Sequence, residues 1–150
     1  MSTPISAPDL TKQPPRSTRV RLGNYALLPR ALDKGRATLI GKNGDYHYAC
    51  PLDQRLLDFL GIEAEPLKAQ LAEGKGDGEI LEWIKANQKN THSDEEIAAW
   101  SATIDVRGPE GDSVEFFNQL LQNAGPQRTD IKTWSALLDL DDYVSFGGKA

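Results

Sequence analysis

Apolar residues recur along most of the chain at intervals of three and four positions, which is the spacing of one face of an α-helix. Three triplets show this spacing, each with an aromatic residue in the middle: Ile97, Trp100 and Ile104; Val114, Phe117 and Leu121; Ile131, Trp134 and Leu138. The pattern predicts seven helices, at about residues 29–40, 51–60, 64–73, 79–87, 94–104, 113–121 and 130–138.

Capping and breaking residues agree with this periodicity. Pro51 suits the first helical position, and Gly61 ends the same helix. Ser93 begins a capping box with the glutamate three residues later, in which each side chain accepts a hydrogen bond from the other residue's backbone. Asp77 and Thr129 are the predicted N-caps of the helices that follow them.

Three segments lack the helical pattern. Pro14 and Pro15 forbid a helix and favour an extended N-terminal arm. The aromatic alternation of residues 46–50 predicts a short extended stretch, and the C-terminal DLDDYVSFGGKA is interpreted as an extended tail. We therefore predict an all-α fold, with a disordered tail over residues 1–8 and a single compact helical domain over residues 9–150.

Length and cysteine content narrow the class of protein. A chain of 150 residues can bury a core without disulfides, and its one cysteine cannot form an internal disulfide. The first residues, MSTPISAPDL, lack the basic and apolar regions of a signal peptide, and no apolar run approaches the length of a membrane span. We expect a cytoplasmic protein that does not contact a membrane.

The net charge of −5 is unevenly distributed. Residues 1–42 carry a net charge of +6, and residues 43–150 carry −11. Two explanations stay open: the basic segment packs on the acidic body and neutralises it, or it holds an anionic ligand. Arginine side chains suit phosphate and carboxylate groups, and two tyrosines nearby could line such a pocket. The candidate ligand-binding residues are Arg16, Arg19, Arg21, Arg30, Lys34, Arg36, Tyr46 and Tyr48. Nucleic acid is not an expected partner, because the whole chain is acidic.

The segment YHYACPLDQR contains the candidate catalytic residues Cys50, His47 and Arg55. Cys50 precedes a helix, whose free N–H groups and dipole stabilise a thiolate. His47 could act as its base only if a turn at Ala49 brings the two side chains together, and Arg55 could orient an anion. The alternative is that Cys50 is a small buried residue at a corner of the chain.

Several familiar motifs are incomplete, so we expect no cofactor and no metal. Cys50 and Arg55 have too few intervening residues for the phosphate-binding loop of tyrosine phosphatases, and a four-ligand zinc site is absent. The glycine-rich GKGDG lacks the Walker pattern. The acidic run 139–142 lacks the rest of a calcium loop and is interpreted as a partner of the basic arm.

The chain resembles a family of small bacterial proteins classed as a domain of unknown function. The resemblance rests on the motifs DLTKQPPRS, LPRALDKGRA, YHYACPLDQR, GKGDGEILEW, EIAAW and LDLDDYVSFGGKA, and it extends from about Asp9 to the end of the chain. It implies a single domain and no particular activity, cofactor or catalytic residue.

These observations favour a noncatalytic binding or interaction module, with a small anionic ligand at the basic N-terminal segment. The alternative is a small enzyme with Cys50 as nucleophile and His47 as base. The pattern leaves the oligomeric state open.

Overall fold

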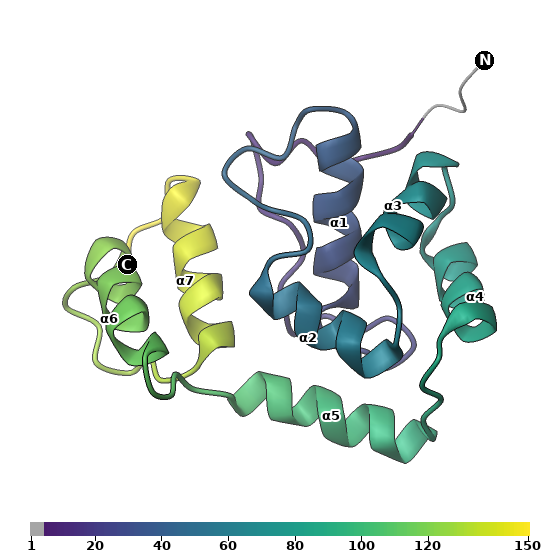
Figure 1. Cartoon of the computed structure of the whole chain (residues 1–150). Coiled ribbons are helices and arrows are strands. Elements are labelled where there is room, and N and C mark those ends of the chain that lie inside the picture. Colours follow the sequence, from purple (N-terminus) through teal and green to yellow (C-terminus); the bar gives the residue numbers. More distant parts are fainter. Residues whose placement is uncertain (1–4) are drawn as a thin grey trace.

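The computed structural model describes residues 5–150, and these form seven α-helices with no β-sheet (Figure 1). The predicted all-α fold is confirmed. The helices are α1 (Leu28–Leu39), α2 (Pro51–Leu60), α3 (Ala64–Ala72), α4 (Asp77–Asn87), α5 (Asp94–Val106), α6 (Ser113–Ala124) and α7 (Trp134–Ser145). No helix among residues 5–150 combines the length and the apolar character that a membrane span requires.

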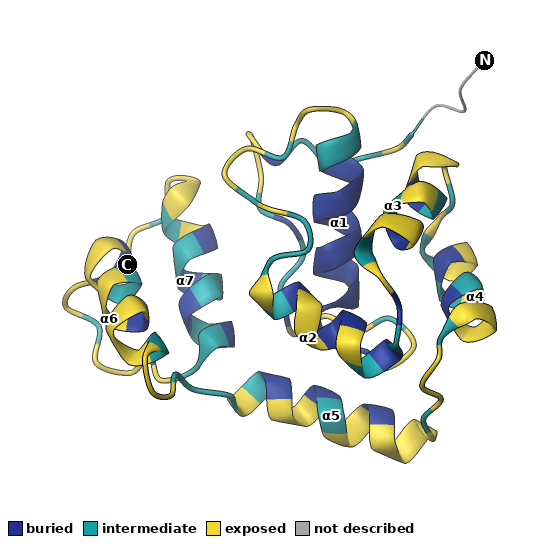
Figure 2. Ribbon diagram, in the orientation of Figure 1, coloured by how far each residue is buried: buried dark blue, intermediate teal, exposed yellow. Residues whose placement is uncertain are grey.

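Helix α1 lies at the centre of the fold. Every residue from Tyr25 to Ala37 is buried, whereas α5 exposes its outer face (Figure 2). Helix α1 packs on both α2 and α3. A surface helix would bury only one stripe of its residues, so the continuous burial marks α1 as the element around which the others are arranged.

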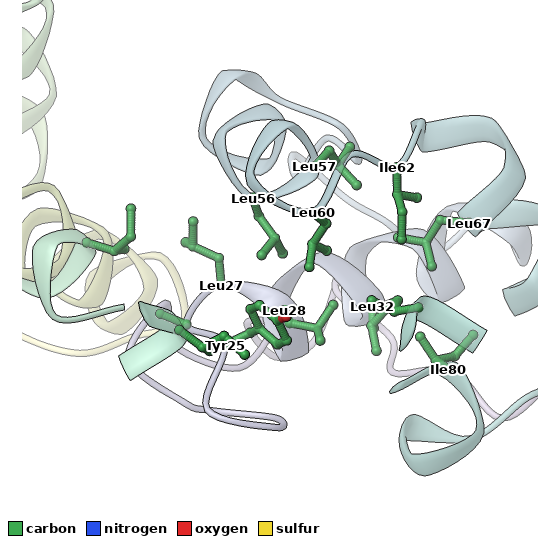
Figure 3. Close-up of a cluster of buried hydrophobic side chains, with 14 of the residues drawn as sticks. Tyr25, Leu27, Leu28, Leu32, Leu56, Leu57, Leu60, Ile62, Leu67 and Ile80 are labelled. Atoms are coloured by element: carbon green, nitrogen blue, oxygen red, sulfur yellow. The ribbon is translucent and has the colours of Figure 1, made fainter. Parts of the chain in front are cut away.

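The larger hydrophobic cluster joins α1 to the helices around it. Leu28 and Leu32 of α1 point towards Leu56 and Leu60 of α2 and towards Leu67 of α3 (Figure 3). These leucines have no exposed surface, and burying each stabilises the fold by about 1.5–3 kcal/mol relative to an exposed position.

Helices α6 and α7 form a second, smaller cluster around Phe117, Leu137 and Leu140. Helix α7 packs on α6 and also on α5, so it connects the smaller cluster to the rest of the molecule. The single domain over residues 9–150 stays a prediction.

The N-terminal segment reaches α1 without forming a helix, as predicted for the extended arm. It contains turns, and Leu10 and Thr18 are buried against the body. Thr18 Oγ1 donates a hydrogen bond to Ser135 Oγ of α7 at 2.8 Å, and Thr18 O accepts one from Leu27 N. Of the predicted tail, residues 1–4 lie outside the described residues, and residues 5–8 have no regular secondary structure.

The prediction of an extended stretch over residues 46–50 is wrong. Tyr48 and Ala49 form a turn, and Ala49 adopts a φ of 61°, in the left-handed region that residues other than glycine rarely occupy. The Asp53 side chain accepts a hydrogen bond from Ala49 N at 3.0 Å and holds this turn. Alternation over five residues is too short to distinguish a strand from a turn.

The prediction of a helix capped by Thr129 and followed by an extended C-terminal tail is also wrong. Helix α7 begins after Thr133, which accepts a hydrogen bond from Ala136 N, and Thr129 is not its cap. The helix then continues to Ser145 through the proposed extended tail. The sequence contained the signal for this continuation, because Leu137, Leu140 and Val144 are spaced i, i+3, i+7.

We predict that Gly35→Ala destabilises the protein by about 1–2 kcal/mol, although alanine is the better helix former. A Cβ at Gly35 would lie 2.6 Å from Leu71 Cδ1 and 3.1 Å from the Tyr48 ring, and both neighbours are packed against α1. The free energy of unfolding in urea measures the effect.

Gly78→Ala is the matched control, because a Cβ at this helical position meets no atom within 4 Å. This variant should be unchanged or more stable by up to about 1 kcal/mol. Equal effects at the two positions would contradict close packing of α1 against α3.

Candidate functional site

The six cations of the predicted ligand-binding set are all engaged in ion pairs. Their carboxylate partners lie on α1, α2, α4, α5 and α7. The pairs are Arg16 with Asp33 and Asp77, Arg19 with Asp139, Arg21 with Asp105, Arg30 with Asp142, Lys34 with Asp53, and Arg36 with Asp77.

Two of these pairs are deeply buried. Arg30 Nη1 lies 2.8 Å from Asp142 Oδ2, and the two side chains are 5% and 9% exposed. Lys34 Nζ lies 2.8 Å from Asp53 Oδ2, at 5% and 2% exposure. A buried charge without a partner costs several kcal/mol, so these contacts attach α7 and α2 to α1.

Arg16 connects the arm to two helices. Its guanidinium donates hydrogen bonds to Asp33 of α1 and to Asp77, the first residue of α4. Asp77 was predicted as an N-cap, but Gly76 occupies that position and Asp77 accepts from Arg16 and Arg36 instead. The hydrogen bond from Arg16, and then that from Arg36, lowers the pKa of the Asp77 carboxyl.

The two predicted tyrosines occupy different surroundings. Tyr46 donates a hydrogen bond to Asp142 Oδ1 at 2.7 Å, and the Arg30 guanidinium lies 5.5 Å from the centre of its ring. Burial, and then the hydrogen bond to Asp142, raises the pKa of Tyr46. Tyr48 donates to the carbonyl of Ala64 at 2.7 Å, and burial raises its pKa. Both hydroxyl groups are therefore engaged within the protein.

Cys50 is the N-cap residue of α2, and its neighbour is Lys34 rather than the predicted His47. Lys34 Nζ lies 3.3 Å from Cys50 Sγ. His47 is exposed and makes no hydrogen bond or ion pair within residues 5–150. The structure thus brings together one residue from the predicted ligand-binding set and one from the predicted catalytic set.

Arg55 lies elsewhere, in a pocket between α2 and α5 with a volume of about 250 Å³. Arg107, which follows α5, lines the same pocket. The chain has eight arginines, and six of them are ion-paired. Within the described part of the chain, Arg55 and Arg107 are the two with no carboxylate oxygen within 4.0 Å, and both line this one pocket.

One wall of the pocket belongs to an aromatic stack. The Trp100 ring stacks on Phe59 with centroids 4.6 Å apart, and Phe59 stacks in turn on His92 at 3.8 Å. The backbone carbonyl of Arg107 accepts a hydrogen bond from Trp134 N, which fixes the chain where α5 ends. The remaining lining residues are Asp58, Thr103 and Ile104.

Charge distinguishes this pocket from the larger hollow on α6. That hollow, of about 970 Å³, contains Asp112 and Glu115 and no cation among its lining residues. The pocket between α2 and α5 has two cations and one carboxylate, a net charge of +1. Of these two hollows, the smaller one has the charge that favours an anion. Within residues 5–150, no cluster of His, Cys, Asp and Glu could hold a metal ion.

Sequence reasoning identified Arg55 as an anion-orienting residue but missed Arg107. The two arginines are separated by 51 intervening residues, and Arg107 lies in an acidic part of the chain. Arg107 is a cation directly after α5, and this was the one signal of its role in the sequence. That Arg107 lies in the same pocket as Arg55 depends on tertiary packing.

The fold and the pocket define a class: an all-α protein with a central helix that is buried from Leu28 to Ala37 and held by ion pairs. The family model for the domain of unknown function DUF5069 matches residues 12–144, and the chain belongs to this family. The predicted resemblance is confirmed. No curated protein matches the chain.

We predict that Asp142→Asn destabilises the protein by about 3–5 kcal/mol, because it leaves the buried Arg30 charge without its partner. Chemical denaturation followed by circular dichroism gives the free energy of unfolding. Asp105→Asn, in the more exposed pair with Arg21, is the control and should cost about 1 kcal/mol or less. Equal losses of unfolding free energy in the two variants would show that the buried Arg30–Asp142 pair contributes no more to stability than the more exposed pair.

We also predict an acid-dependent effect at Asp77. Its folded-state pKa lies below the unfolded value of about 3.9, so the ionised carboxyl contributes stability above that pH. This contribution is lost as the pH falls from about 4 towards the lowered pKa. Asp77→Asn should therefore be less stable than the wild type at pH 7, and the difference should shrink at pH 2.5.

Urea unfolding at the two pH values measures this difference. Asp45→Asn is the control at pH 7, because Asp45 is exposed and has no ion-pair partner within residues 5–150. A stability difference between Asp77→Asn and the wild type that stays constant with pH would contradict a lowered pKa of the Asp77 carboxyl.

Proposed function

We propose that this protein is a noncatalytic binding module for a small anionic ligand, and that the ligand occupies the pocket formed by Arg55 and Arg107. The observation that carries the proposal is that the two arginines without an ion-pair partner in the described chain line the same pocket. The basic N-terminal segment is the less favoured location, because an anion there would have to displace carboxylates from existing pairs.

The chemistry of the pocket suits one carboxylate or phosphate group. A guanidinium donates two parallel hydrogen bonds to either group, and charged hydrogen bonds contribute more than neutral ones. Ile104 and the stacked Trp100 give the pocket an apolar side, so the anionic group belongs to a molecule with an apolar or ring-shaped part. The Asp58 carboxylate limits the charge of the ligand, because it repels a group with a high negative charge.

The alternative, an enzyme with Cys50 as nucleophile and His47 as base, has less support. His47 makes no contact that would orient it towards the thiol, and the pocket that contains Arg55 is not lined by Cys50. An anion oriented by Arg55 would therefore be bound away from the proposed nucleophile.

The test is a titration of the ¹⁵N-labelled protein with inorganic phosphate at constant ionic strength, observed at the arginine Nε–Hε resonances. We expect saturable shifts of Arg55 and Arg107, with a dissociation constant in the roughly millimolar range. Arg55→Gln and Arg107→Gln should each weaken binding about tenfold or more, since each removes a charged hydrogen-bond donor.

Arg128→Gln is the matched control, because Arg128 already pairs with Asp130 and lies outside the pocket. It should bind phosphate like the wild type. The proposal fails if phosphate produces no saturable shift up to about 50-fold above the expected constant. It also fails if the shifts are confined to Arg19 and Arg21, which would place the ligand on the arm.

A further inference from the structure

We propose that the ligand of the pocket between α2 and α5 is a free α-amino acid with an apolar side chain. This inference rests on the proposed function and names the class of ligand: Arg55 and Arg107 bind its carboxylate, and Asp58 binds its ammonium group. The observation that carries it is that the pocket is lined by charged residues of both signs that form no ion pair with one another.

Arg55 and Asp58 are close in the chain but do not pair. Asp58 follows Arg55 by three positions on α2, a spacing at which opposite charges on a helix can meet. Glu65 and Lys68 of α3 have the same spacing and lie 3.5 Å apart. In that pair the acidic residue comes first, which is the more favourable order, whereas in α2 the basic residue comes first. Among residues 5–150, Asp58 has no Lys, Arg or His nitrogen within 4.0 Å.

These charges select a ligand that carries both signs. A ligand with only an anionic group binds the two guanidinium groups but is repelled by the Asp58 carboxylate. A ligand with only a cationic group binds Asp58 but is repelled by both arginines. A carboxylate and an ammonium group on one molecule give all three side chains a partner. Such a ligand also displaces no existing ion pair of the described chain.

The size and the apolar wall of the pocket suit a single amino acid. Its volume of about 250 Å³ is below the roughly 300–1,000 Å³ of pockets that hold drug-sized ligands. Ile104 is buried, and Trp100 is half-buried with its ring stacked on Phe59. An apolar or aromatic side chain of the ligand packs against these two residues, while its charged groups face the arginines and Asp58.

The experiment titrates the full ¹⁵N-labelled chain with three probes at pH 7 and constant ionic strength: L-phenylalanine, N-acetyl-L-phenylalanine and L-phenylalaninamide. All three contain the ring, but the acetylated probe lacks the ammonium charge and the amide lacks the carboxylate. We expect phenylalanine to give saturable shifts of the Arg55 and Arg107 Nε–Hε resonances, with a dissociation constant in the roughly millimolar range. Each of the other two probes should bind about tenfold more weakly, because each loses one charged hydrogen-bonding group.

Asp58→Asn tests the assignment of the ammonium site. Asp58 is exposed, and its side chain makes no hydrogen bond or ion pair within residues 5–150, so the variant should fold like the wild type. It should bind phenylalanine about tenfold more weakly and N-acetyl-phenylalanine at least as tightly as the wild type does. The preference for phenylalanine over the acetylated probe should therefore disappear.

Asp45→Asn is the matched control. It removes the same charge from an exposed position outside the pocket, so it should keep the tenfold preference for phenylalanine.

Two outcomes overturn this inference and leave the proposed function standing. One is equal affinity of the wild type for phenylalanine and N-acetyl-phenylalanine, which would show that the pocket recognises a carboxylate alone, such as that of a peptide C-terminus. The other is a saturable response to inorganic phosphate without any response to phenylalanine. If neither phosphate nor any of the three probes shifts the two arginine resonances, the proposed function fails together with the inference.

Discussion

The structure depends on the need to find a partner for each charge that the central helix buries. Helix α1 carries Arg30, Asp33, Lys34 and Arg36 in buried positions, and an unpaired charge at any of them would cost several kcal/mol. Their partners come from α7, the N-terminal arm, α2 and α4 respectively. Leucine packing alone allows many arrangements of helices around α1. The four charged residues of α1 restrict these arrangements, because each surrounding element must place one side chain of complementary charge at one point of α1.

This arrangement is also the reason why the proposed anion site lies away from α1. The guanidinium groups that serve the fold have already given their donors to carboxylates, and an anion would compete with partners held at close range. The hydrogen bonds of Arg16 illustrate this, since it contacts Asp33 and Asp77 together. Among residues 5–150, Arg55 and Arg107 have no carboxylate oxygen within 4.0 Å and lie outside the network. The same residue type therefore has a structural role around α1 and a binding role, as proposed, between α2 and α5.

What the sequence predicted correctly was local in the chain. Ser93 and Glu96 cap α5 as expected, with hydrogen bonds of 3.0 and 3.1 Å, and Gly61 ends α2 in the left-handed conformation. Both signals span four residues or fewer. The overall charge split was also readable, because opposite charges in one chain tend to pair. The individual pairs were not readable, since Arg30 and Asp142 are 112 positions apart. Carboxylates of similar appearance are available on several helices, and only tertiary packing selects among them.

The same need for a charge partner applies to Lys34 of α1, which pairs with Asp53 of α2. A buried lysine–aspartate pair is seldom more stabilising than apolar side chains of equal volume, so stability alone does not account for Lys34 and Asp53. The pair is also incomplete, because Asp53 Oδ1 has no hydrogen-bond donor among residues 5–150. The Lys34 ammonium has a second contact, with Cys50 Sγ at 3.3 Å. The Lys34–Asp53 pair is therefore better explained by its effect on where α2 meets α1 than by a net gain in stability.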